Sequence, residues 1–114
     1  MIINTQKIPS NHPILNNEIF GPIALCDAFK TNKEAIQKAN QTPYGLGTSI
    51  WTNHSKHIED AINHIECGNL AINQPVHSAF DSPFGGWKAS GIGLELGLEG
   101  SHSFTRFKAI QTRP

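Results

Sequence analysis

The sequence has no excess of charge and little cysteine, and both shortages exclude classes of function. Nine Lys and Arg residues balance nine Asp and Glu residues in a chain of 114 residues, so no basic field is available for nucleic acid or an anionic membrane. Two cysteines, Cys26 and Cys67, are too few for a disulfide framework. We expect both thiols to be reduced, with Cys26 buried in an apolar strand.

Long apolar segments and internal repeats are also missing. The first residues hold no sustained apolar stretch, which predicts neither a signal peptide nor a membrane span. No repeat, linker or low-complexity tract interrupts the chain. We therefore expect a single domain over residues 1–114, located in the cytoplasm.

Strand and helix signals alternate through the middle of the chain. Residues 23–29, 47–52 and 69–73 are apolar or β-branched stretches of strand length. Two helix signals separate them, and short connections join them all. This order predicts an α/β fold with a mostly parallel sheet and flanking helices.

The two helices carry recognisable ends. Thr31 and Glu34 have the spacing of a capping box, which predicts that the first helix begins there. The second helix, within residues 54–68, repeats apolar side chains at helical spacing, and Gly68 is placed to end it. After residue 73 the pattern predicts a loop over residues 74–88, a short helix near residues 94–100 and a last strand over residues 104–111.

Five glycines lie within residues 82–97, and they raise the question of a phosphate-binding loop. No convincing strand leads into Gly91 and Gly93, and too little chain follows for a crossover unit with an acidic residue. No Gly-Lys-Ser/Thr sequence is present either. The pattern therefore favours tight turns and close backbone packing over phosphate binding.

Two other candidate sites have simpler explanations. His57, Asp60 and His64 share one side of the second helix at a spacing that suits a metal ion, but a solvated polar face explains them equally well. Cys67 is a conceivable nucleophile beside His64, although the end of a helix opposes a thiolate. We predict no catalytic residue and no metal ligand among them.

Glu18 and Phe20 have more chemical promise. Glu18 is flanked by Ile19, Phe20 and a Gly-Pro turn, an unusual setting for a solvated acid. Its carboxylate can accept hydrogen bonds from both hydroxyls of a vicinal diol, and Phe20 can lie against a flat ring. The alternative is a surface acid beside a core phenylalanine.

Four stretches together resemble the NAD(P)-dependent aldehyde dehydrogenases in order and spacing. The resemblance covers essentially the whole chain and weakens only over the first seventeen residues. The stretches are EIFGPI at residues 18–23, EAIQKANQTPYGLGTSIWT at residues 34–52, GNLAIN at residues 68–73 and PFGGWKASGIGLELGLEG at residues 83–100.

The resemblance implies roles for three residues. Glu18 would bind the nicotinamide ribose hydroxyls of NAD or NADP, and Phe20 would pack near the nicotinamide. Phe84 would border the aldehyde-binding tunnel, and the variable residues 74–82 would adapt it to the substrate. Residues 104–111 would be the family's closing strand.

The resemblance also implies what the chain lacks. In the family, the nucleophilic cysteine and the general-base glutamate lie well upstream of the Glu-x-Phe-Gly-Pro motif, and the dinucleotide-binding domain lies further upstream. We therefore expect a C-terminal portion of the catalytic domain that is inactive by itself and holds no cofactor tightly. The alternative is a non-catalytic interaction module that self-associates or pairs with full-length dehydrogenase subunits.

Overall fold

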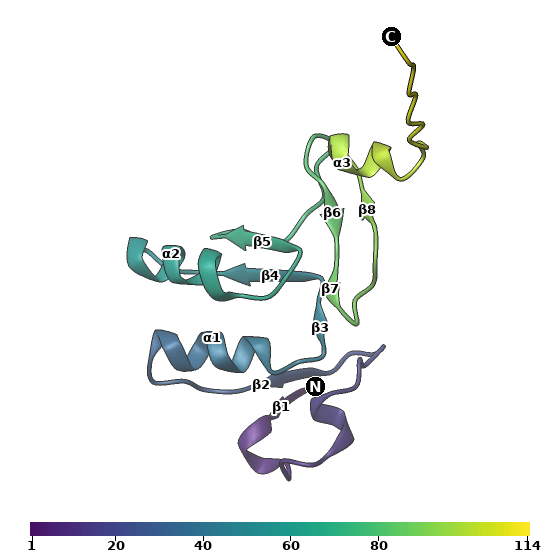
Figure 1. Ribbon diagram of the computed structural model, residues 1–114. Coiled ribbons are helices and arrows are strands. Elements are labelled where there is room, and N and C mark those ends of the chain that lie inside the picture. The colour runs from purple at the N-terminus through teal and green to yellow at the C-terminus, as the bar shows by residue number, and fades with distance from the viewer. The chain divides into compact units, whose positions relative to one another are not determined.

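A computed structural model describes residues 1–114 and divides them into two compact units. One unit comprises Met1–Pro43 with Thr52–Glu66, and the other comprises Tyr44–Trp51 with Cys67–Pro114. Helices and parallel strand pairs occur together, so the predicted α/β class is confirmed (Figure 1). That the two units unfold together as one domain stays a prediction. No helix has the length and apolar character needed to cross a bilayer.

The first unit opens with a strand that the sequence pattern did not predict. β1 (Ile2–Asn4) pairs in parallel with β2 (Ala24–Cys26), with Ile3 opposite Leu25. A strand of three residues is too short to show a period of two, which explains the omission. β2 is also shorter than predicted, and Cys26 is exposed rather than buried. In a ladder of two strands, each strand remains an edge.

The first helix begins where the sequence predicts. In α1 (Asn32–Asn40), the Thr31 hydroxyl accepts a hydrogen bond from the Glu34 amide at 3.1 Å. The Glu34 carboxylate accepts from the Lys30 amide at 2.8 Å, instead of from the amide of the N-cap residue. The capping box is thus present with its second bond moved back by one residue.

The second helix is confirmed, but Gly68 does not end it. α2 (Ser55–His64) buries Ala61, and the chain is already extended at Ile65. Asn40, at the end of α1, supplies the cap: its amide nitrogen donates to the His64 carbonyl at 2.7 Å, and its amide oxygen accepts from the Glu66 amide at 2.9 Å. A side chain from a neighbouring helix thus replaces the expected C-terminal glycine.

The second unit contains the other parallel pair. β4 (Gly47–Ile50) and β5 (Asn69–Ile72) lie side by side, with Thr48 opposite Leu70 (Figure 1). Ala71 of β5 is buried. Both strands fall within the ranges that the sequence predicts.

The region after β5 is more regular than predicted. Residues 74–88 contain two short strands as well as loop, and the short helix starts at residue 97 instead of residue 94. Each short strand is one half of an antiparallel pair. The pairs are β3 (Tyr44–Gly45) with β7 (Trp87–Lys88), and β6 (Phe84–Gly85) with β8 (Leu94–Glu95), and α3 (Gly97–His102) follows.

The predicted last strand over residues 104–111 is not formed in this chain. Residues 105–114 have no regular structure, and Phe104, Phe107 and Ile110 are 92%, 93% and 80% exposed. A strand needs a neighbouring backbone to satisfy its amide and carbonyl groups, and these residues make no ladder with any part of the chain.

Candidate functional site

Residues 18–21 form a tight turn in the first unit, after η2 (Pro13–Leu15) and before β2. The Gly21 amide donates to the Ile19 carbonyl at 3.1 Å, and the Ile23 amide donates to the Gly21 carbonyl at 2.8 Å. Ile19 is half-buried, whereas the Phe20 side chain is 95% exposed. The turn therefore anchors one apolar side chain and leaves the next one uncovered.

Glu18 is the free polar group of this turn. Its side chain is exposed and makes no hydrogen bond or ion pair within the protein, so all its acceptor positions face solvent. A Cβ atom on Gly21 would meet nothing within 4 Å, so the backbone beside it is open as well. The free carboxylate can accept hydrogen bonds from a vicinal diol, and the uncovered aromatic ring can pack against a flat ring joined to that diol. The open backbone leaves room for both.

Phe84 lies in the second unit, on β6. It pairs with Glu95 of β8 and is half-buried. The residue after it is fixed by Asn69, whose amide nitrogen donates to the Gly85 carbonyl and to the Leu46 carbonyl, both at 2.9 Å. Asn69 thereby joins β6 to the chain entering β4.

Sequence reasoning did not identify Asn69 as important. Its position, directly after Gly68 at the start of a strand, is the feature of the sequence that indicates its role. Asn is depleted in strands, so a strand that begins with it calls for a reason such as side-chain hydrogen bonding to the backbone.

The glycines around Phe84 allow backbones to approach closely. A Cβ atom on Gly68 would overlap the Gly85 carbonyl oxygen. On Gly86, it would lie 2.6 Å from the Ser90 Cβ atom. The Ser90 hydroxyl also accepts a hydrogen bond from the Gly45 amide at 2.9 Å. These positions admit hydrogen and nothing larger.

The glycines further along serve turns. Gly91 has a φ of 125° and Gly93 a φ of 104°, values that residues with a Cβ atom rarely adopt. Neither glycine would meet another atom if it gained a Cβ, so conformation and not space requires glycine here. The predicted tight turns and close backbone packing are therefore confirmed.

The polar face of α2 is occupied by contacts within the unit. Asp60 accepts from Lys56 at 3.1 Å and from Asn32 at 3.0 Å, and its pKa is lowered, chiefly by the bond to Lys56. His64 uses its Nδ1 atom to contact the Asp60 carbonyl oxygen at 2.8 Å. No three His, Cys, Asp or Glu side chains are grouped as metal ligands.

The two cysteines are placed differently from the prediction. The Cys67 thiol donates to the Asn69 carbonyl at 3.3 Å and is half-buried. It lies beyond the end of α2, since that helix stops at His64, so the dipole argument against a thiolate at Cys67 loses its basis. Both thiols are free.

Comparison with known proteins gives a consistent result. Residues 5–110 match the aldehyde dehydrogenase family. An aldehyde dehydrogenase-like protein of Schizosaccharomyces pombe is 42% identical over 100 residues, which are 88% of this chain and 20% of that protein.

Solved structures agree with the sequence relatives. Betaine aldehyde dehydrogenase of Staphylococcus aureus, in complex with NAD+, has a TM-score of 0.82 and 33% identity over 90% of this chain and 20% of its own. Succinic semialdehyde dehydrogenase of Streptococcus pyogenes, with NADP+ as the cofactor, has a TM-score of 0.81 and 38% identity over 90% of this chain and 22% of its own. The chain thus spans about a fifth of the length of these relatives.

Proposed function

The chain belongs to the aldehyde dehydrogenase family, and from this premise we propose that it is a C-terminal part of the catalytic domain, contributing one wall of the cofactor and aldehyde sites. The parent reaction oxidises an aldehyde to a carboxylic acid with NAD or NADP, in the cytoplasm. The observation that carries the proposal is the uncovered turn at residues 18–21, whose carboxylate and ring have no partner in the protein.

Glu18 and Phe20 form the cofactor wall. The Glu18 carboxylate accepts hydrogen bonds from both hydroxyls of the nicotinamide ribose, because it is exposed and otherwise unpaired. Phe20 packs beside the nicotinamide ring. Its side chain is 95% exposed, and this contact would remove that apolar surface from water. When bound, the nicotinamide nucleotide supplies the acceptor for the hydride that leaves the substrate.

Phe84 forms the substrate wall. Its half-buried ring offers an apolar side to the aldehyde, and residues 74–82 shape the space next to it. The hydrogen bonds of Asn69 to the Gly85 carbonyl and the tight approach of Gly68 hold the backbone behind the ring. A site built on a fixed backbone positions its ligand better than one on a free loop.

The 114-residue chain by itself gives no turnover. Aldehyde oxidation through a covalent intermediate needs a thiolate to attack the carbonyl carbon and a base to activate water. The four stretches that resemble the family contain neither group in the required role. The chain also binds NAD or NADP weakly, because one wall of the cofactor site makes only part of the contacts that hold the cofactor.

A turnover assay tests this account. The purified chain is mixed with NAD+ or NADP+ and a panel of aldehydes, and reduced cofactor is followed by absorbance. We expect no hydride transfer above the background. Turnover that persists in a Cys67→Ala variant would contradict the proposal, and turnover that disappears in it would identify Cys67 as the nucleophile of a stand-alone enzyme.

A second candidate function is a non-catalytic interaction module. The observation in its favour is the C-terminal segment of residues 104–114, which has no ladder partner and exposes Phe104, Phe107 and Ile110. A segment without a ladder partner and with exposed apolar side chains can add to the sheet edge of a second copy or of a full-length dehydrogenase subunit.

Gel filtration with light scattering tests the module. An oligomer that becomes a monomer when residues 104–114 are deleted would support association through this segment. A monomer at all concentrations of the intact chain would count against self-association, and mixing with a full-length aldehyde dehydrogenase then tests the other partner.

A further inference from the structure

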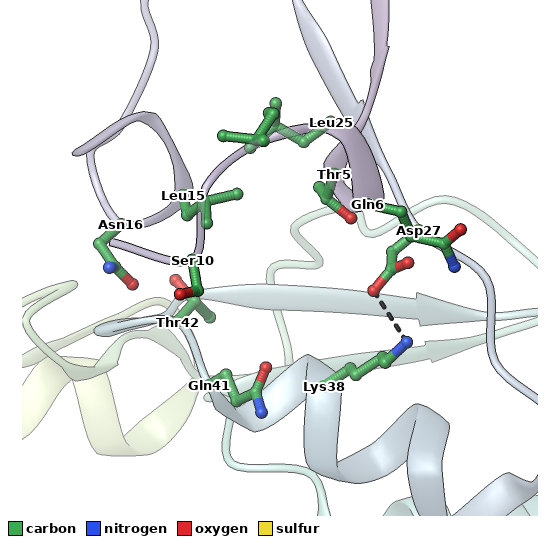
Figure 2. Close-up of a pocket in the computed structure, with 11 residues that line it drawn as sticks. Thr5, Gln6, Ser10, Leu15, Asn16, Leu25, Asp27, Lys38, Gln41 and Thr42 are labelled. Atoms are coloured by element: carbon green, nitrogen blue, oxygen red, sulfur yellow. Dashed lines mark ion pairs between the residues drawn. The ribbon is translucent and has the colours of Figure 1, made fainter. Parts of the chain in front are cut away.

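A pocket of about 540 Å³ lies within the first unit, and none of residues 18–21 lines it. Its lining comes from η1 (Thr5–Lys7), the chain after it, η2, β2 and the end of α1. In Figure 2 these segments surround a common space, with Asn16 at one end and the ion pair of Asp27 and Lys38 at the other. Pockets that bind small molecules commonly measure about 300–1,000 Å³.

Besides Gln6, three uncharged polar side chains of the lining have no hydrogen-bond partner in the protein. They are Ser10, Asn16 and Gln41, and each comes from a different segment. A hydroxyl and two carboxamides offer both donors and acceptors. Such a set matches ligand groups that also donate and accept, as hydroxyl groups do.

The charged groups of the pocket are already paired. The Lys38 ammonium lies 2.9 Å from Asp27 and 3.1 Å from Glu34, and it donates to the Ala28 carbonyl at 2.6 Å. The Thr5 hydroxyl is bonded to Asp27 as well. One cation among two carboxylates leaves no free positive charge, so the pocket does not suit a phosphate or a carboxylate ligand.

Apolar side chains complete the lining. Ile8, Leu15 and Leu25 are half-buried and come from three segments. In Figure 2, Leu15 and Leu25 border the same space as Ser10 and Asn16. An apolar surface next to donors and acceptors fits a ligand with C–H faces and hydroxyl edges.

We propose that this pocket binds a neutral polyhydroxylated molecule, of the size of a mono- or disaccharide. The site is independent of the cofactor and aldehyde walls proposed above, since it uses none of their residues. Hydrogen bonds to Ser10, Asn16 and Gln41 orient the ligand, and the half-buried leucines contact its C–H face.

NMR titration of the isotope-labelled chain with maltose tests the proposal. The side-chain amide signals of Asn16 and Gln41 report directly on the pocket. We expect both to shift along a saturable curve with a Kd of about 1 mM. Asn16→Ala should raise that Kd about fivefold, because it removes a hydrogen bond to the ligand.

Two controls make the result decisive. Asn17→Ala changes the neighbouring residue, which does not line the pocket, and should leave the Kd within about twofold of the unaltered chain. Gln41→Ala should also raise the Kd about fivefold, and Gln37→Ala, at a position on α1 that does not line the pocket, is its control. Inorganic phosphate at the same concentrations should shift neither signal. Absence of a saturable shift with maltose, equal effects of the Asn16 and Asn17 variants, or tighter binding of phosphate would overturn the proposal.

Discussion

The turn at residues 18–21 and the segment around Phe84 both carry family motifs, yet they are built in opposite ways. At the turn, Glu18 and Phe20 touch little of the protein, and the neighbouring Gly21 has open space around it. Around Phe84, glycines and Asn69 lock one backbone against another. One family motif therefore lies on an exposed turn, whereas the other lies where two backbones pack closely.

This difference separates two kinds of mutational effect. Substitutions in the segment around Phe84 should change the free energy of unfolding, because that segment packs against its own chain. Substitutions in the turn should leave that free energy almost unchanged and alter only ligand binding. Each prediction below tests one side of the contrast.

The largest effect is expected from Gly68→Ala. The added methyl group would overlap the Gly85 carbonyl oxygen, so a backbone has to move and the free energy of unfolding should fall by about 2–3 kcal/mol. Gly21→Ala is the matched control, with nothing near the new methyl group, and should change it by less than about 0.5 kcal/mol. Chemical denaturation of both variants measures the difference. Equal changes in the free energy of unfolding for the two variants would contradict the difference between the turn and the segment around Phe84.

Asn69→Ala should have the next largest effect. The variant loses the bonds to the Leu46 and Gly85 carbonyls, and we expect about 1–3 kcal/mol of destabilisation. Asn63→Ala, an exposed asparagine on α2, is the control and should be nearly neutral. A neutral Asn69→Ala in urea titrations would mean that these bonds do not hold β6.

A smaller effect concerns the dependence of stability on pH. Bonds to Lys38 and to the backbone lower the pKa of Asp27 from 3.8 and that of Glu34 from 4.5, with the Lys38 bond the largest cause for Asp27 and the Lys30 amide the largest for Glu34. A carboxyl group with a lowered pKa in the folded state stabilises the fold above its ordinary pKa and loses that contribution as the pH falls.

Lys38→Met should therefore flatten the loss of stability below about pH 5. The contribution is small because the groups are near the surface, and Asp60 with Lys56 still provides a similar one. Lys33→Met, which removes an unpaired lysine from the same helix, should keep the original pH profile. Thermal unfolding from pH 3 to pH 7 distinguishes the two; identical profiles for both variants would refute the role of Lys38.

The sequence predicted those elements whose cause is local. The capping residues Thr31 and Glu34 define the start of α1, and the spacing of apolar residues defines α2. The strands β4 and β5 also follow from their own residues. In each case the physical signal lies within one short stretch of chain.

The features that sequence did not predict depend on distant partners. Asn40 ends α2 from another helix, and Asn69 reaches two separate carbonyl groups. β1 exists because β2 lies beside it, and Cys26 is exposed because the face of β2 that carries Ala24 and Cys26 is uncovered. Chemistry and the resemblance both point to Glu18 and Phe20, and the resemblance alone points to Phe84. Their roles toward a ligand stay predictions.

The most direct test of the central claim is an NMR titration of the chain with NAD+. We expect the backbone amides of residues 18–21 to shift weakly, with a Kd of about 1 mM or higher, and Glu18→Gln to raise that Kd about tenfold. Asp81→Asn, which neutralises an exposed acid of the second unit, should have no effect. Unshifted amides at residues 18–21, or equal affinities for the unaltered chain and Glu18→Gln, would contradict the account.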